Sequence, residues 1–100
     1  MVKHVILWTL KEEYTPEQKE HIKKEIKQGI ESLLGKIDGL LDIKVYITGL
    51  SSSNADLMLD STFTDEQSLK NYAVHPEHVA VANNIVRPHT ASRSCLDYEI

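Results

Sequence analysis

The stretch Tyr72-Ala73-Val74-His75-Pro76-Glu77-His78 brings two imidazoles and a phenol together in one short segment. A neutral imidazole, with a pKa near ~6.5, can take a proton from a carbon acid, and a phenol can donate to the enolate oxygen that forms. His78 and Tyr72 are therefore candidate catalytic residues if the fold turns both toward one cavity. The alternative is structural: Tyr72 is then a core residue, and His78 helps to cap the helical segment that Pro76 opens.

His4 and His75 complete the histidines that could share such a site. His75 directly precedes a proline, where a helix N-cap or a spacer is the simplest interpretation. Three imidazoles, those of His4, His75 and His78, have the composition of an open zinc site. Pro76 separates two of them, however, and no nearby Cys or carboxylate has a recognised ligand spacing. We therefore expect no metal at this site.

The other reactive groups favour no cofactor. Cys95 has only Arg93 as a basic neighbour in sequence, and a buried cysteine behaves as a small apolar residue. The 4 glycines are scattered, so no loop of the phosphate-binding type is present. We expect chemistry at this site, where it occurs, to need no cofactor.

Composition limits the classes of partner. The net charge of −4, from 11 Lys+Arg and 15 Asp+Glu, disfavours a nucleic-acid partner. A single cysteine excludes an intrachain disulfide, which fits a reducing compartment. The chain begins directly in a strand pattern without signal-peptide features, and no apolar run reaches the roughly 18 residues of a membrane helix. We expect one cytoplasmic domain over residues 1–100, with no membrane partner.

The elements that must position these groups follow the order β-α-β-β-α-β. Alternating apolar residues predict the strands, and Thr-Pro-x-Gln and Thr-Asp-Glu-Gln sequences predict the starts of the helices. The predicted strands are 2–10, 41–48, 55–63 and 92–100; the first helix covers 16–34, and the second starts at 64–67, breaks at Pro76 and ends near Pro88.

This order predicts an α+β, ferredoxin-like fold: a four-stranded antiparallel sheet with both helices on one face. We assign one face of the first strand, with His4, Ile6, Trp8 and Leu10, to the helix-covered side. In the last strand we assign Leu96 to that side, and Arg93, Cys95 and Asp97 to the open side. The open face would then also carry the apolar residues Val5, Leu7, Tyr46 and Met58. Because such a surface is too apolar for water, we expect homodimerisation through it.

Several segments together resemble the stress-responsive A/B barrel (Dabb) family. They are Lys3-His4-Val5-Ile6-Leu7, the strand from Asp56 to Phe63, the segment from Leu69 to His78 with its Tyr-x-x-His-Pro-x-His pattern, and Asp97-Tyr98. The resemblance covers essentially the whole chain. It implies ferredoxin-like protomers that pair into a dimeric α+β barrel.

One branch of this family, the plant olivetolic acid cyclases, uses a histidine and a tyrosine of this motif. They promote an intramolecular aldol condensation without metal or cofactor. The matching positions here are His78 and Tyr72, with His4 at the family's first-strand histidine, while a further pocket histidine of that branch corresponds to Leu57.

Together these observations predict a homodimer that binds a small, partly apolar molecule between sheet and helices, with cyclase- or lyase-type acid–base chemistry. The candidate catalytic residues are His78, Tyr72 and His4, and the candidate substrate-binding residues are Trp8, Leu57, Leu59 and His75. Two alternatives stay open. One is a non-enzymatic, stress-associated dimeric module with structural histidines, and the other is a cofactor-independent monooxygenase.

Overall fold

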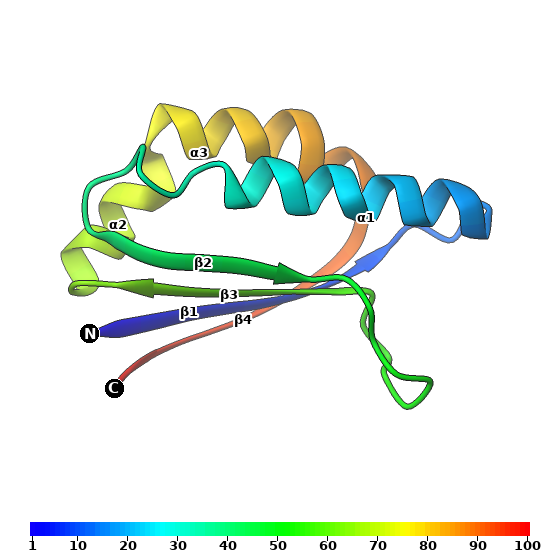
Figure 1. Cartoon of the computed structure of the whole chain (residues 1–100), viewed down its shortest axis with the longest axis horizontal. Helices are drawn as coiled ribbons and strands as arrows, with labels where there is room; N and C mark the ends of the chain where they lie inside the picture. The colour runs from blue at the N-terminus through cyan, green and yellow to red at the C-terminus, as the bar shows by residue number, and fades with distance from the viewer.

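The computed structural model describes all residues 1–100 and consists of a four-stranded sheet with its helices on one side (Figure 1). The strands lie in the order β2-β3-β1-β4, and all neighbouring pairs are antiparallel. The elements are β1 (Val2–Leu10), α1 (Pro16–Glu31), β2 (Leu40–Tyr46), β3 (Leu57–Phe63), α2 (Glu66–Val74), α3 (Pro76–Val81), a π-helical segment (Ala82–Val86), a 3-10 turn (Arg87–His89) and β4 (Thr90–Glu99). This arrangement confirms the predicted ferredoxin-like fold.

The helix-covered face of β1 is the predicted one. Its buried residues alternate with residues that are half-buried or exposed, and the buried set is Val2, His4, Ile6, Trp8 and Leu10. They pack in one apolar core with the buried side chains of β2, β3, α1 and α2. Because alternate residues of a strand point to opposite faces, this pattern places His4 beneath the helices.

Side-chain caps fix where the helices begin. The Thr15 hydroxyl accepts from the Gln18 backbone N–H at 3.2 Å, and the Gln18 side chain accepts from the Thr15 N–H at 2.9 Å, which confirms the predicted capping box of α1. In α2 the N-cap is Asp65 rather than Thr64, and its carboxylate accepts from the Ser68 N–H at 2.8 Å. None of the helices combines the length and apolar composition that a membrane crossing requires.

Pro76 separates α2 from α3, as its position in the sequence predicts. His75 is the C-cap of α2 and the N-cap of α3, and its Nδ1 accepts from the Glu77 N–H at 3.1 Å. Proline lacks a backbone donor and disfavours a helical residue before it, so α2 ends here and α3 starts in a new direction. The junction turns α3 back over the sheet (Figure 1).

The predicted assignment of faces on β4 is wrong. Directly opposed residues of neighbouring strands share a face. The register of β1 and β4 pairs His4 with Asp97, Ile6 with Cys95, and Trp8 with Arg93. Arg93, Cys95 and Asp97 therefore face the helices, and Leu96 lies on the open side, opposite Val5. Alternation of apolar residues suggested the reverse because the open face is itself apolar.

The two faces of the sheet separate the carboxylates of Asp60 and Asp97. Asp60 lies on the open side, where it pairs with Lys3 Nζ at 2.6 Å. Asp97 lies on the helix side and contacts the imidazole of His4. The two acids therefore belong to different surfaces of the sheet.

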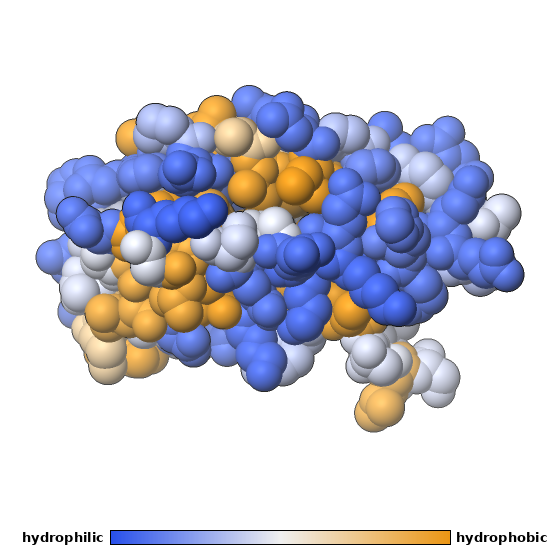
Figure 2. All heavy atoms as spheres, turned by 45° about the horizontal axis from the view of Figure 1, so that its top comes forward, coloured by the Kyte–Doolittle hydropathy of each residue, from blue (hydrophilic) through white to orange (hydrophobic).

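The open sheet face exposes large apolar side chains. Those more than two-fifths exposed are Leu7 (42%), Tyr46 (48%), Leu96 (65%) and Tyr98 (42%). The opposite side of the molecule, seen in Figure 2, is mainly hydrophilic with separate apolar patches. The loop between β2 and β3 projects beyond the sheet on the side away from the helices (Figure 1). The open sheet face thus carries several of the large apolar side chains that remain uncovered.

Candidate functional site

A cavity of about 370 Å³ lies between the sheet and the helices. This volume is within the range of small-molecule sites, about 300–1,000 Å³. The residues of functional interest that line it are His4 and Trp8 from β1, Leu59 from β3, Tyr72 from α2, His78 from α3 and Arg93 from β4. All three candidate catalytic residues therefore border one cavity, together with the candidate binding residues Trp8 and Leu59.

Leu57 and His75, the other two candidate binding residues, do not line this cavity. Leu57 is buried in the core at the start of β3, where it pairs with Trp8. The His75 ring is held at the helix junction by the Glu77 N–H. His75 thus has the N-cap role that its position before Pro76 indicated.

Tyr72 is almost completely buried. Its ring stacks on that of His78, with centroids 4.2 Å apart and planes inclined by 34°, and meets the edge of Phe63 at 5.0 Å. Its hydroxyl is buried and has no hydrogen-bond partner. Burial raises the pKa of this phenol well above its ordinary value. The hydroxyl therefore keeps its proton near neutral pH and is available as a donor.

His78 has the opposite tendency. Its Nδ1 lies 3.2 Å from the Ala73 carbonyl oxygen, which can only accept. The proton of the neutral ring is therefore on Nδ1, and Nε2 carries the free lone pair. Burial lowers the pKa of His78, against the opposing effect of the hydrogen bond to Ala73. Near neutral pH the imidazole is uncharged and can act as a base.

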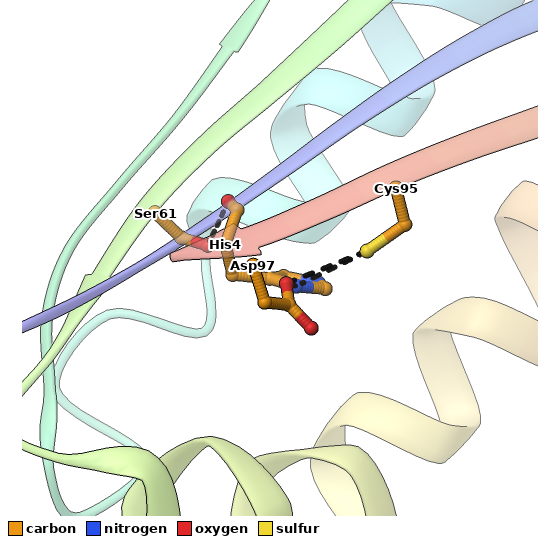
Figure 3. Close-up of polar contacts among 4 residues, drawn as sticks. All are labelled: His4, Ser61, Cys95 and Asp97. Carbon is orange, nitrogen blue, oxygen red and sulfur yellow. Dashed lines mark hydrogen bonds and ion pairs between the residues drawn. The ribbon is translucent and has the colours of Figure 1, made fainter. Parts of the chain in front are cut away.

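His4 is oriented by a contact that spans the whole sequence. Its Nδ1 meets the Asp97 carboxylate, 93 residues away (Figure 3). A carboxylate accepts, so Nδ1 carries the proton and Nε2 is free, as in other histidine–carboxylate pairs. The Ser61 hydroxyl donates to the His4 backbone carbonyl at 2.8 Å, which fixes the strand beneath the ring. The His4 ring centroid is 6.1 Å from that of Tyr72.

Three residues of β4 belong to this site although the sequence pattern did not indicate it: Arg93, Cys95 and Asp97. Arg93 brings a cation to the cavity wall, and Cys95 and Asp97 lie beside His4. Their alternation in sequence showed that they share a face. Only the pairing of the first strand with the last shows which face that is.

The family model of the stress responsive A/B barrel domain matches residues 2–100. The chain belongs to the Dabb family. Among solved structures, a dimeric protein of unknown function with a ferredoxin-like fold from Bacteroides fragilis is 34% identical, with a TM-score of 0.91 over 99% of this chain and 95% of the other.

More distant matches share the fold alone. A Dabb family protein from Mesorhizobium loti is 19% identical, with a TM-score of 0.74 over 99% of this chain and 95% of that one. A hydroxynitrile lyase from Passiflora edulis is 17% identical, with a TM-score of 0.73 over 99% and 92%. No curated protein sequence matches the chain.

In this Dabb protein the cavity combines complementary groups. His4 and His78 each direct their Nδ1 proton to a protein acceptor, which leaves both Nε2 atoms as proton acceptors. Tyr72 supplies a hydroxyl donor, and Arg93 supplies a positive charge. Such a set can remove a proton from a substrate and stabilise the oxyanion that results.

Proposed function

We propose that this Dabb protein binds a small, partly apolar carbonyl compound in the cavity and acts on it by cofactor-free acid–base chemistry of the cyclase or lyase type. The observation that carries the proposal is the Tyr72 hydroxyl, which is buried without a partner beside two imidazoles. An unsatisfied buried hydroxyl costs about 1–3 kcal/mol of stability. A ligand oxygen that accepts from it would explain why the group is present.

The geometry supports distinct roles for the two main groups. In the cyclase direction, His78 Nε2 takes a proton from the carbon next to a carbonyl, and Tyr72 donates to the enolate oxygen. The enolate carbon then forms a bond to a second carbonyl of the same molecule, and the resulting alkoxide takes the proton back. In the lyase direction, His78 removes a hydroxyl proton, the O–H electron pair forms a carbonyl, and the carbon–carbon bond breaks. The departing carbanion is then protonated by the imidazolium.

His4 and Asp97 support this chemistry from the sheet. The carboxylate keeps the proton on Nδ1 of His4, so that Nε2 can accept a second proton or bind the substrate. Trp8 and Leu59 supply apolar walls for the rest of the molecule. The hydroxynitrile lyase of the same fold indicates that this architecture is compatible with lyase chemistry.

Two simple reactions test the proposal. Cleavage of mandelonitrile, measured by the release of benzaldehyde, tests the lyase direction. Exchange of the α-protons of acetophenone in deuterated water tests proton abstraction. We expect the wild type to accelerate at least one of them. Loss of a general base or an oxyanion donor lowers rates by about 10²-fold or more, so His78→Gln and Tyr72→Phe should each show such a loss. His21→Asn, on the exposed face of α1, is the matched control.

Binding can be followed independently, because Trp8 is the single tryptophan of the chain and lines the cavity. Its fluorescence should change on titration with acetophenone. If neither reaction exceeds the buffer rate and the fluorescence does not respond, the non-enzymatic interpretation is favoured. Equal rates in the wild type and His78→Gln would exclude the role given to this imidazole.

We also propose that the protein is a homodimer that pairs through the open sheet face. The large exposed side chains of this face support the proposal, as does the dimeric description of the Bacteroides fragilis relative. The cavity opens on the other side of the sheet, so pairing would leave it accessible.

The single cysteine, unpaired in the chain, supports a reducing and therefore cytoplasmic location.

A further inference from the structure

We propose that His4, Cys95 and Asp97 form a binding site for a divalent zinc ion. One ligand atom from each residue, the imidazole Nδ1, the thiol Sγ and a carboxylate oxygen, lies within 4.8 Å of the other two. The side chains of Cys95 and Asp97 extend from β4 toward His4, in the space between sheet and helices (Figure 3). Nitrogen, sulfur and oxygen donors of these types are those that zinc prefers.

The two separations from the sulfur fit a tetrahedral ion. With bonds of about 2.3 Å to sulfur and about 2.0–2.1 Å to nitrogen or oxygen, neighbouring ligand atoms of a tetrahedral site are about 3.3–3.6 Å apart. Cys95 Sγ lies 3.4 Å from Asp97 Oδ1 and 3.7 Å from His4 Nδ1. The nitrogen and the oxygen lie closer together because they are hydrogen-bonded to each other. An ion that replaces this proton would move them apart to the same spacing.

The surroundings allow an ion and leave one position open. The three ligands line a groove between β4 and α2, whose other charged residues are Glu66, Lys70, Arg93 and Glu99. The charges of these two acids and two bases cancel. The negative charges of the Cys95 thiolate and the Asp97 carboxylate therefore favour binding of a dication. Cys95 and Asp97 are exposed, and the site lies on the opposite face of β4 from the proposed dimer surface. The fourth ligand would be water or a molecule bound in the groove.

The same cluster is poorly suited to a thiolate nucleophile. Partial desolvation of the sulfur, together with the hydrogen bond to Asp97, raises the pKa of the Cys95 thiol. His4 directs its Nδ1 toward the carboxylate and not toward the sulfur, which is farther away. A metal ion, in contrast, deprotonates a thiol when it binds, so zinc binding here should release protons and weaken as the pH falls.

Cobalt is a direct probe, because a Co²⁺–thiolate bond absorbs in the near ultraviolet and Cys95 is the only cysteine. We expect Co²⁺ to produce this band in the wild type at one ion per chain, and Zn²⁺ to abolish it by displacement. Cys95→Ser should lose the band, and Asp97→Asn should bind Zn²⁺ at least about tenfold more weakly in calorimetry. His21→Asn, which removes an exposed imidazole of α1, should bind as the wild type does.

The measurement needs no turnover, so its outcome does not depend on the acid–base proposal. The two proposals meet only at His4, where a bound ion would replace the Nδ1 proton. Absence of the thiolate band in the wild type would overturn the zinc site. Equal Zn²⁺ affinity in the wild type and Cys95→Ser would also overturn it, since binding would then lie elsewhere on the chain. Cys95 is exposed, so its serine variant should keep the wild-type circular dichroism, and Asp97→Asn provides an independent second variant.

Discussion

Replacing Tyr72 by phenylalanine removes one oxygen and keeps the ring that packs on His78 and Phe63. If the hydroxyl is held for a ligand, the variant should be more stable than the wild type and less active. In most proteins the loss of a buried tyrosine hydroxyl destabilises, because its hydrogen bond is lost. Here the structure contains no such bond to lose.

The size of the gain follows from the burial of the group. An unsatisfied buried polar group costs about 1–3 kcal/mol, and the lower end applies because Tyr72 borders a cavity of about 370 Å³ that admits water. We therefore expect a gain of about 1 kcal/mol in the free energy of unfolding, which corresponds to about 4–8 °C in melting temperature for a domain of this size.

Urea unfolding and calorimetry at one protein concentration would measure the change, since the stability of a dimer depends on concentration. Tyr14→Phe is the control: this tyrosine is half-buried, lies outside the cavity and should stay within about 0.5 kcal/mol of the wild type. A loss of 1 kcal/mol or more in Tyr72→Phe would refute the reasoning. It would mean that the hydroxyl has a structural partner.

Three further predictions concern the base, the dimer and the positioning carboxylate. Because burial lowers the pKa of His78, the acid limb of kcat/KM should lie below pH ~6.5 and should disappear in His78→Gln. The stability linked to this group is present above its unfolded pKa and is lost as the pH falls through the lower folded pKa. Urea unfolding at a series of pH values would detect this loss. Leu7→Lys and Met58→Lys should give monomers or aggregates by light scattering. Leu34→Lys, at a residue exposed to a similar extent as Leu7 but off the sheet, should keep the wild-type mass. An unchanged dimer in the two sheet variants would exclude this interface. Asp97→Asn should lower kcat by about 10–100-fold and change the tautomer of its imidazole partner in ¹⁵N spectra; an altered tautomer with unaltered kcat would show that the orientation does not matter.

Local sequence was sufficient to predict the elements and the junction that carries the candidate site. Thr15 and Gln18 specify a capping box, and the proline at position 76 specifies a helix break wherever the chain is placed. Because these effects depend on neighbours a few residues apart, they could be predicted without the tertiary structure. The proximity of Tyr72 to His78 depends on the same local geometry.

The tertiary structure alone decided which face of β4 meets the helices. Both faces of the sheet in one chain carry apolar residues, so hydrophobic alternation could not distinguish the core face from the uncovered face. Leu96 was therefore assigned to the wrong face. The contact of His4 with Asp97 joins residues at opposite ends of the chain and depends on the register of β1 against β4. A shift of one residue would turn Asp97 and Cys95 away from His4, and no local pattern in the sequence encodes that register.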